Sequence, residues 1–177
     1  MFGGVLEDAD TGAEKFLASL CLNSTPTTVN SYDEQALLAK VRYNRLIDIF
    51  TGITSYSLQN HLRTTVMGMG QVETDEVYIG INQRGAHYVF PVQAKGGTDK
   101  LNIVQIEQDI ALCKEKFKDL VCIAIGAQFM SDNLIALFGF QETPEGIRLA
   151  LEKHYRLTLF QEITQEEIQA YRQQSIG

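Results

Sequence analysis

The chain has 177 residues, 45% of them hydrophobic and 21% charged, which suits one domain with a substantial core and excludes a disordered chain. No apolar run reaches the ~18 residues of a membrane span, and the N-terminus lacks the basic and apolar regions of a signal peptide. A net charge of −7 disfavours tight, metal-free binding to nucleic acid. The three cysteines have no metal-ligand spacing, so we expect reduced thiols in a cytoplasmic protein.

We expect a single domain over residues 1–177. Its three parts are an N-terminal lead with a short helix (1–31), a core (33–159) and a C-terminal helix (164–174). The short helix is expected over 13–22. Thr164 and Glu167 form the capping-box pattern that predicts the start of the last helix.

The first half of the core is expected to hold two helices and a hairpin. Apolar residues recur at helical spacing over 33–50 on two sides of the helix, and Gly52 is a stop signal. A second, shorter helix is expected over 55–65. Two strand-like runs joined by a turn predict a hairpin over 73–95.

The second half of the core is expected to add one helix and three strands. Apolar positions over 101–117 are spaced 3, 4, 3 and 4 residues apart, which indicates a helix. The continuous apolar run over 120–127 indicates a strand covered on both faces. Further strands are expected over 134–140 and 147–159. A strand–helix–strand unit implies a parallel pair with a right-handed crossover, so we predict an α/β fold with a mixed central β-sheet flanked by helices.

Polar groups on the hairpin point to metal-dependent chemistry. Gly85 suggests a three-residue loop, which pairs Asp75 with Gln93 and Glu73 with Lys95. A two-residue loop would shift the register by one and bring Glu76 to the same place. Either register gathers carboxylates, an amide and an ammonium group, and hydrolysis of a phosphodiester by a divalent metal uses such groups as ligands and as a cation beside the attacking water.

These residues resemble the PD-(D/E)xK nuclease superfamily, the restriction-endonuclease-like proteins. In that family an acidic residue on one strand precedes (Glu/Asp/Gln)-x-Lys on the antiparallel next strand. Asp75 matches the acid, and Gln93-Ala94-Lys95 matches the Gln-x-Lys variant. The resemblance covers roughly residues 33–157, includes the following helix and buried strand, and is similar to a group of bacterial type II restriction-endonuclease-like proteins. It therefore implies a restriction-endonuclease-like core.

The resemblance also implies a role for each residue of the motif. Asp75 binds Mg²⁺, for which Mn²⁺ substitutes, and the Gln93 amide oxygen replaces the usual Glu as a ligand. The main-chain carbonyl of Ala94 supplies a further oxygen. Lys95 orients or activates the water and stabilises negative charge on the phosphate. Glu34, at the start of the first core helix, is the best match for an additional acid.

Three of these assignments have alternatives. Because Gln93 is neutral, Glu73 or Glu76 are candidate substitutes as ligands. The acidic cluster of Glu73, Asp75 and Glu76 would otherwise be a solvated strand edge. Glu34 would otherwise only complement the helix dipole.

The expected function is that of a metal-dependent endodeoxyribonuclease of the restriction type, acting on DNA and not at a membrane. Cleavage of both strands would favour a homodimer. Lys100, Gln105 and Arg63 are candidate DNA contacts, whereas Gln105, Gln108 and Asp109 would otherwise form a solvated helix face. The alternatives are a non-catalytic DNA- or protein-binding module of the same fold and a purely structural interaction domain.

Overall fold

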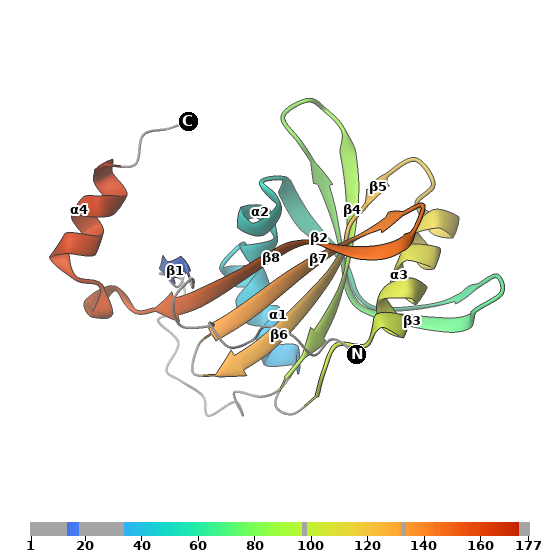
Figure 1. Ribbon diagram of the computed structural model, residues 1–177, viewed down its shortest axis with the longest axis horizontal. Coiled ribbons are helices and arrows are strands. Elements are labelled where there is room, and N and C mark those ends of the chain that lie inside the picture. Colours follow the sequence, from blue (N-terminus) through green and yellow to red (C-terminus); the bar gives the residue numbers. More distant parts are fainter. Residues whose placement is uncertain (1–13, 18–33, 97–98, 132–133, 174–177) are drawn as a thin grey trace.

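The computed structural model describes residues 14–17, 34–96, 99–131 and 134–173. Four helices and eight strands are found in this part of the chain, together with one short 3-10 helix (Figure 1). In chain order they are β1 (Glu14–Leu17), α1 (Glu34–Tyr43), α2 (Leu46–Thr51), β2 (Thr54–Val66), β3 (Gly70–Ile81), β4 (His87–Lys95), α3 (Ile103–Lys116), β5 (Val121–Cys122), β6 (Ala124–Ser131), β7 (Leu134–Thr143), β8 (Gly146–Thr158), η1 (Phe160–Glu162) and α4 (Gln165–Gln173).

The strands form one mixed sheet, which confirms the predicted α/β fold. Its order is β1-β8-β7-β6-β4-β3-β2, and β5 pairs with β4 beside this path. Strands β4 and β6 are parallel and are joined through α3, as the strand–helix–strand pattern predicts. The pair β1 and β8 is also parallel, whereas the hairpins β2–β3, β3–β4, β6–β7 and β7–β8 are antiparallel.

Helices cover both faces of the sheet at its centre. Val92 and Ala94 of β4 join the core cluster that contains Leu37 of α1 and Phe50 of α2. Val89 of the same strand joins a second cluster with buried residues of α3. Because side chains alternate along a strand, α1 and α2 lie on one face of the sheet and α3 lies on the other (Figure 1). We call these the α1 face and the α3 face.

Three element predictions before the hairpin are wrong. Residues 55–65 form β2, not a helix. This strand lies at the sheet edge and is mostly exposed, so its sequence lacks the apolar alternation of a half-buried strand. The helix expected over 33–50 is split into α1 and α2, because Arg45 adopts a left-handed conformation with φ 54°. In the N-terminal lead, residues 14–17 form β1 where the short helix was expected; the other residues of 13–22 lie outside the described part of the chain.

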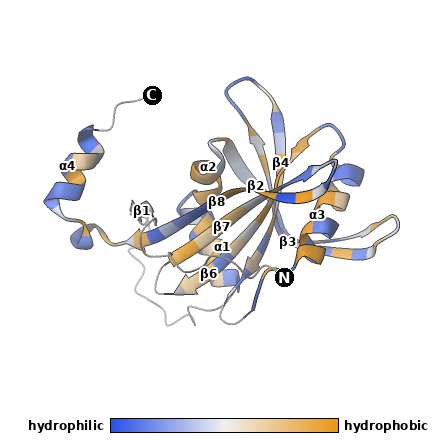
Figure 2. Cartoon of the chain, in the orientation of Figure 1, coloured by the Kyte–Doolittle hydropathy of each residue, from blue (hydrophilic) through white to orange (hydrophobic). Residues whose placement is uncertain are grey.

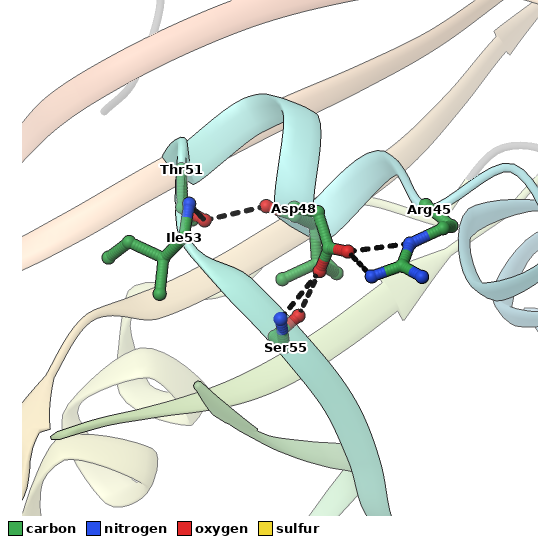
Figure 3. Close-up of polar contacts among 6 residues, drawn as sticks. Arg45, Asp48, Thr51, Ile53 and Ser55 are labelled. Carbon is green, nitrogen blue, oxygen red and sulfur yellow. Dashed lines mark hydrogen bonds and ion pairs between the residues drawn. The ribbon is translucent and has the colours of Figure 1, made fainter. Parts of the chain in front are cut away.

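Side-chain hydrogen bonds fix the corner between α2 and β2 (Figure 3). Gly52 ends α2 in the left-handed region with φ 69°, as its sequence position predicts. Asp48 accepts hydrogen bonds from the Arg45 side chain and from the Ser55 backbone N–H, the latter at 2.9 Å. Thr51 Oγ1 donates to the Ile47 carbonyl at 2.7 Å and accepts from the Ile53 N–H. The corner therefore directs β2 back along the sheet.

Polarity follows these layers. Figure 2 shows apolar residues along the central strands β6 and β7 and polar residues over much of α4. Helix α4 extends away from the sheet beyond the end of β8 (Figure 1), and its capping box is present, with Glu167 N–H donating to Thr164 Oγ1 at 3.2 Å. In the described residues no helix has the length and hydropathy needed to cross a membrane.

Candidate functional site

The β3–β4 hairpin has the predicted three-residue loop. Asn82 N–H donates to the Ala86 carbonyl at 3.0 Å, and Gly85 occupies the left-handed region with φ 81°. The paired residues run from Ile81 opposite His87 to Glu76 opposite Val92. This register excludes the two-residue loop that would have moved Glu76 into the position of Asp75.

Regular pairing between β3 and β4 ends just before Asp75. Beyond Glu76 and Val92, the Ala94 N–H donates instead to the Asp75 carboxylate, with 2.8 Å between N and Oδ2. None of the described residues donates to the other oxygen, Asp75 Oδ1. A half-buried carboxylate is therefore anchored by one oxygen at the point where the two strands stop pairing.

The strands change which residues face α3 at this same point. On one side of Asp75, Val77 packs in the cluster on the α3 face; on the other side, Val72 does so. Odd- and even-numbered residues thus exchange faces near Asp75. Across the sheet, His61 of β2 lies between the pairs made by its two neighbours and has φ 49°, a left-handed conformation inside a strand. Because of this irregularity, the Asp75 side chain does not follow the alternation of faces in a regular strand.

Lys95 and Glu34 complete a cluster with Asp75. Lys95 Nζ lies 3.0 Å from Glu34 Oε1, which joins the end of β4 to the first turn of α1. The Lys95 side chain is 14% exposed and that of Glu34 is 36% exposed, so solvent reaches both side chains while their ion pair limits their movement. We refer to Glu34, Asp75 and Lys95 as the β4-end cluster.

Electrostatics couple the members of this cluster. Burial raises the pKa of Asp75 above its ordinary value, and the charge of Glu34 raises it further. The Ala94 N–H, the Lys95 ammonium and the His61 side chain lower the pKa in opposition. Two carboxylates with one lysine between them form a place where an added cation would relieve repulsion.

The Gln93 amide nitrogen makes its hydrogen bonds on the α3 face of the sheet, whereas the Lys95 ammonium pairs with Glu34 of α1. The Gln93 side chain is 1% exposed and turns toward α3. Gln93 Nε2 donates to Asp109 Oδ1 at 3.2 Å, to Asp109 Oδ2 at 3.1 Å and to the Glu73 carbonyl at 3.0 Å. The amide nitrogen is fully used in these contacts, and none of the described residues donates to the amide oxygen.

The two neighbouring acids that were held as substitutes lie elsewhere. Glu73 forms an exposed ion pair with Arg63 across β2 and β3, with 3.0 Å between Oε2 and Nε. Glu76 is fully buried and lies on the α1 face, where its Oε1 is 2.8 Å from Arg42 Nε and accepts from Ser57 Oγ. Neither side chain joins the β4-end cluster, so Asp75 is the acid of β3 that does.

The candidate DNA contacts are scattered around this region. Arg63 is exposed but is already paired with Glu73. Lys100 is exposed in the segment between β4 and α3, and Gln105 is half-buried in the first part of α3. The structure therefore places Lys100 and Gln105 along the chain that leaves the β4-end cluster and places Arg63 on the edge strand.

Two residues near the cluster were missed or misassigned from the sequence. Asp109 was expected on a solvated face, but it is fully buried and also accepts from Thr74 Oγ1. Gln128 of β6 donates to the carbonyls of Lys95 and Asp99 at 3.2 and 3.0 Å, which holds the chain as it leaves β4. Asp109 lies one helical turn after the apolar Ile106, which could have indicated that it is buried. Its hydrogen-bond partners are distant in the sequence, so they could not be predicted from it.

The oxygen atoms around the cluster suit a hard cation, although the carboxylates are few. In the parts of the chain that the structure describes, no three His, Cys, Asp or Glu side chains are grouped as a metal site. Asp75 and Glu34 supply two carboxylates, and the Gln93 amide oxygen, which accepts from none of the described residues, is a neutral donor. Mg²⁺ prefers oxygen ligands and keeps several waters, so this donor set fits Mg²⁺ better than a metal that needs sulfur or imidazole.

Comparisons with models of protein families, with curated proteins and with solved structures found no match.

Proposed function

We propose that this protein is a metal-dependent phosphodiester hydrolase that cleaves DNA at the β4-end cluster. The observation that carries the proposal is the convergence of Glu34, Asp75 and Lys95 from three elements, with the Lys95–Glu34 ion pair at 3.0 Å and Asp75 anchored by the backbone N–H that precedes Lys95. Restriction-type cleavage in the cytoplasm, with a homodimer for cutting both strands, is part of the same proposal.

Each group has a chemical task in such a reaction. Asp75 and Glu34 would hold Mg²⁺, with the Gln93 amide and the Ala94 main chain as further oxygen donors. The metal, when bound, lowers the pKa of a coordinated water and stabilises charge on the phosphate oxygens. Lys95 orients the attacking water and stabilises the negative charge that grows on the phosphoryl group. The Ala94 N–H keeps Asp75 Oδ2 in place, which leaves Oδ1 for the cation.

A second candidate is a non-catalytic DNA-binding module of the same fold. One observation favours it. Position 93 carries a neutral amide, so in the described residues the cluster has the two carboxylates of Glu34 and Asp75 and no third one. Fewer negative charges weaken the attraction for Mg²⁺. Such a module would bind DNA equally well with a chelator present.

A plasmid-nicking assay separates these functions. Supercoiled DNA is incubated with Mg²⁺ or Mn²⁺ and the purified protein, and single cuts convert it to the relaxed form. Asp75→Asn and Lys95→Ala should each lower the rate by about 10²–10³-fold while circular dichroism stays unchanged.

The exposed residues Asp119 and Lys118 offer matched controls. Asp119→Asn and Lys118→Ala make the same chemical changes far from the cluster and should leave the rate unchanged. Nicking by the wild type that persists in Asp75→Asn would refute the assignment of the site. DNA binding in EDTA without nicking by any divalent ion would favour the binding module.

A further inference from the structure

We infer that Asp109 is a positioning residue that orients the Gln93 amide. In this orientation the amide nitrogen points toward α3 and the amide oxygen can act as a metal ligand. This inference rests on the proposed function. Both oxygens of Asp109 accept from Gln93 Nε2, at 3.2 and 3.1 Å. Sixteen residues separate the pair, so the contact is made only by the packing of α3 on the sheet.

The orientation of the amide follows from its acceptors. An amide has donors only on its nitrogen, and the three neighbours of Gln93 Nε2 are two carboxylate oxygens and the Glu73 carbonyl, which all accept. Reversing the amide would place its oxygen against three acceptors and leave buried groups unpaired, which is costly. The oxygen therefore points away from α3.

The surroundings of Asp109 strengthen this control. Asp109 is fully buried, and Thr74 Oγ1 donates to its Oδ1, so the carboxylate is itself held in place. Thr74 precedes Asp75 on β3, and Glu73, whose carbonyl takes the second amide hydrogen, precedes Thr74. The same short stretch of β3 thus supports both the metal-binding carboxylate and the amide beside it.

The pair also explains why an amide occupies position 93. A glutamate there would place a second buried carboxylate against Asp109, and two such groups at hydrogen-bond distance repel. An amide donates to Asp109 and still presents an oxygen. A glutamate at position 93 is therefore best accommodated when the side chain at position 109 donates a hydrogen bond.

A reciprocal exchange tests the inference. Four proteins are compared at pH 8: the wild type, Asp109→Asn, Gln93→Glu and the double variant Gln93→Glu/Asp109→Asn. Mn²⁺ affinity is measured by calorimetry, folding stability by urea unfolding, and nicking in parallel. The exposed Asp119→Asn serves as the control for a carboxylate lost elsewhere.

We expect Asp109→Asn to weaken Mn²⁺ binding by about 10-fold, as for loss of a group that orients a ligand, because the introduced asparagine accepts or donates and no longer selects one amide orientation. In the Gln93→Glu background the same change should strengthen binding, because the asparagine amide donates to the glutamate introduced at position 93. Opposite effects of Asp109→Asn on Mn²⁺ affinity in the two backgrounds support the inference. If Asp109→Asn alone does not fold, the comparison between Gln93→Glu and the double variant still measures the effect in the glutamate background.

The other outcomes overturn the inference in distinguishable ways. A change in stability with unaltered Mn²⁺ affinity would make Asp109 purely structural. Equal weakening by Asp109→Asn in both backgrounds would remove the link to Gln93, and if the wild type still nicks DNA, the proposed function stands without it. A wild type that neither binds Mn²⁺ nor nicks DNA removes the inference together with the proposed function.

Discussion

Lys95 Nζ and Glu34 Oε1 lie 3.0 Å apart although 61 residues separate them in the chain. Lys95 ends β4 and Glu34 begins α1, and α2, β2 and β3 lie between these two elements in the chain. The contact brings the first turn of a helix to the end of a central strand, beside a carboxylate that the neighbouring backbone already holds. A structural pair would serve equally well on the surface, whereas this one borders the half-buried Asp75.

The buried pair of Glu76 and Arg42 should matter most for stability. Glu76 is fully buried, and Arg42 Nε is 2.8 Å from its Oε1. Arg42→Ala leaves that carboxylate without its cation, so the free energy of unfolding should fall by about 3 kcal/mol. Urea unfolding followed by circular dichroism measures the change.

The exposed pair of Arg63 and Glu73 is the matched control. Both side chains are well exposed, and Arg63→Ala should cost less than about 1 kcal/mol. Similar losses from Arg42→Ala and Arg63→Ala would show that burial of Glu76 does not set the cost.

Asp109 should make stability depend on pH. Burial raises the pKa of Asp109 to about 7, against the hydrogen bonds from Thr74 and Gln93 that lower it. In the unfolded chain the group ionises near pH ~4. Between these values the folded protein holds the extra proton, so this residue's contribution to stability falls as pH rises, by up to about 1.4 kcal/mol per pH unit.

Urea unfolding in EDTA, from about pH 4.5 to about pH 8, measures this contribution as the difference between the wild type and Asp109→Asn. Other carboxylates titrate alike in both proteins. The wild type should lose stability relative to the variant across this window and then run parallel to it. A difference that stays constant with pH would contradict the assignment.

His61 should tolerate glycine better than a β-branched residue. Its φ of 49° is left-handed, a conformation that costs an L-residue roughly 1–2 kcal/mol and that valine adopts least readily. His61→Gly should be at least as stable as the wild type, and His61→Val should be less stable by about 1–2 kcal/mol. Thr64→Val, on the same strand in regular pairing with Val72, is the control and should be close to neutral. Equal effects of valine at both positions would argue against the left-handed conformation.

The elements that could be predicted from the sequence are those whose buried residues follow a regular spacing. The 3-4 spacing of α3 and the continuous apolar run of β5 and β6 identified the parallel unit, and Gly85 identified the hairpin loop and hence the register of Asp75. Strand β2 was mistaken for a helix because an exposed edge strand carries no alternating apolar signal.

The faces of the site residues could not be predicted in the same way. Strict alternation predicted that Glu73, Asp75 and Val77 share one face, but β3 exchanges faces between Thr74 and Glu76, and no local pattern predicts the left-handed conformation of His61. Asp109 lies off the apolar stripe of its helix, so it was expected in solvent. Its burial depends on Thr74 and Gln93, which are 35 and 16 residues away.

Titration of Mn²⁺, with the free ion followed by electron paramagnetic resonance, tests the central claim most directly. The wild type should bind Mn²⁺ saturably, and Asp75→Asn should remove that binding while Asp119→Asn retains it, because Asp75 presents its free oxygen beside Glu34. Identical isotherms for Asp75→Asn and the wild type, or no saturable binding by the wild type, would contradict a metal site at the end of β4.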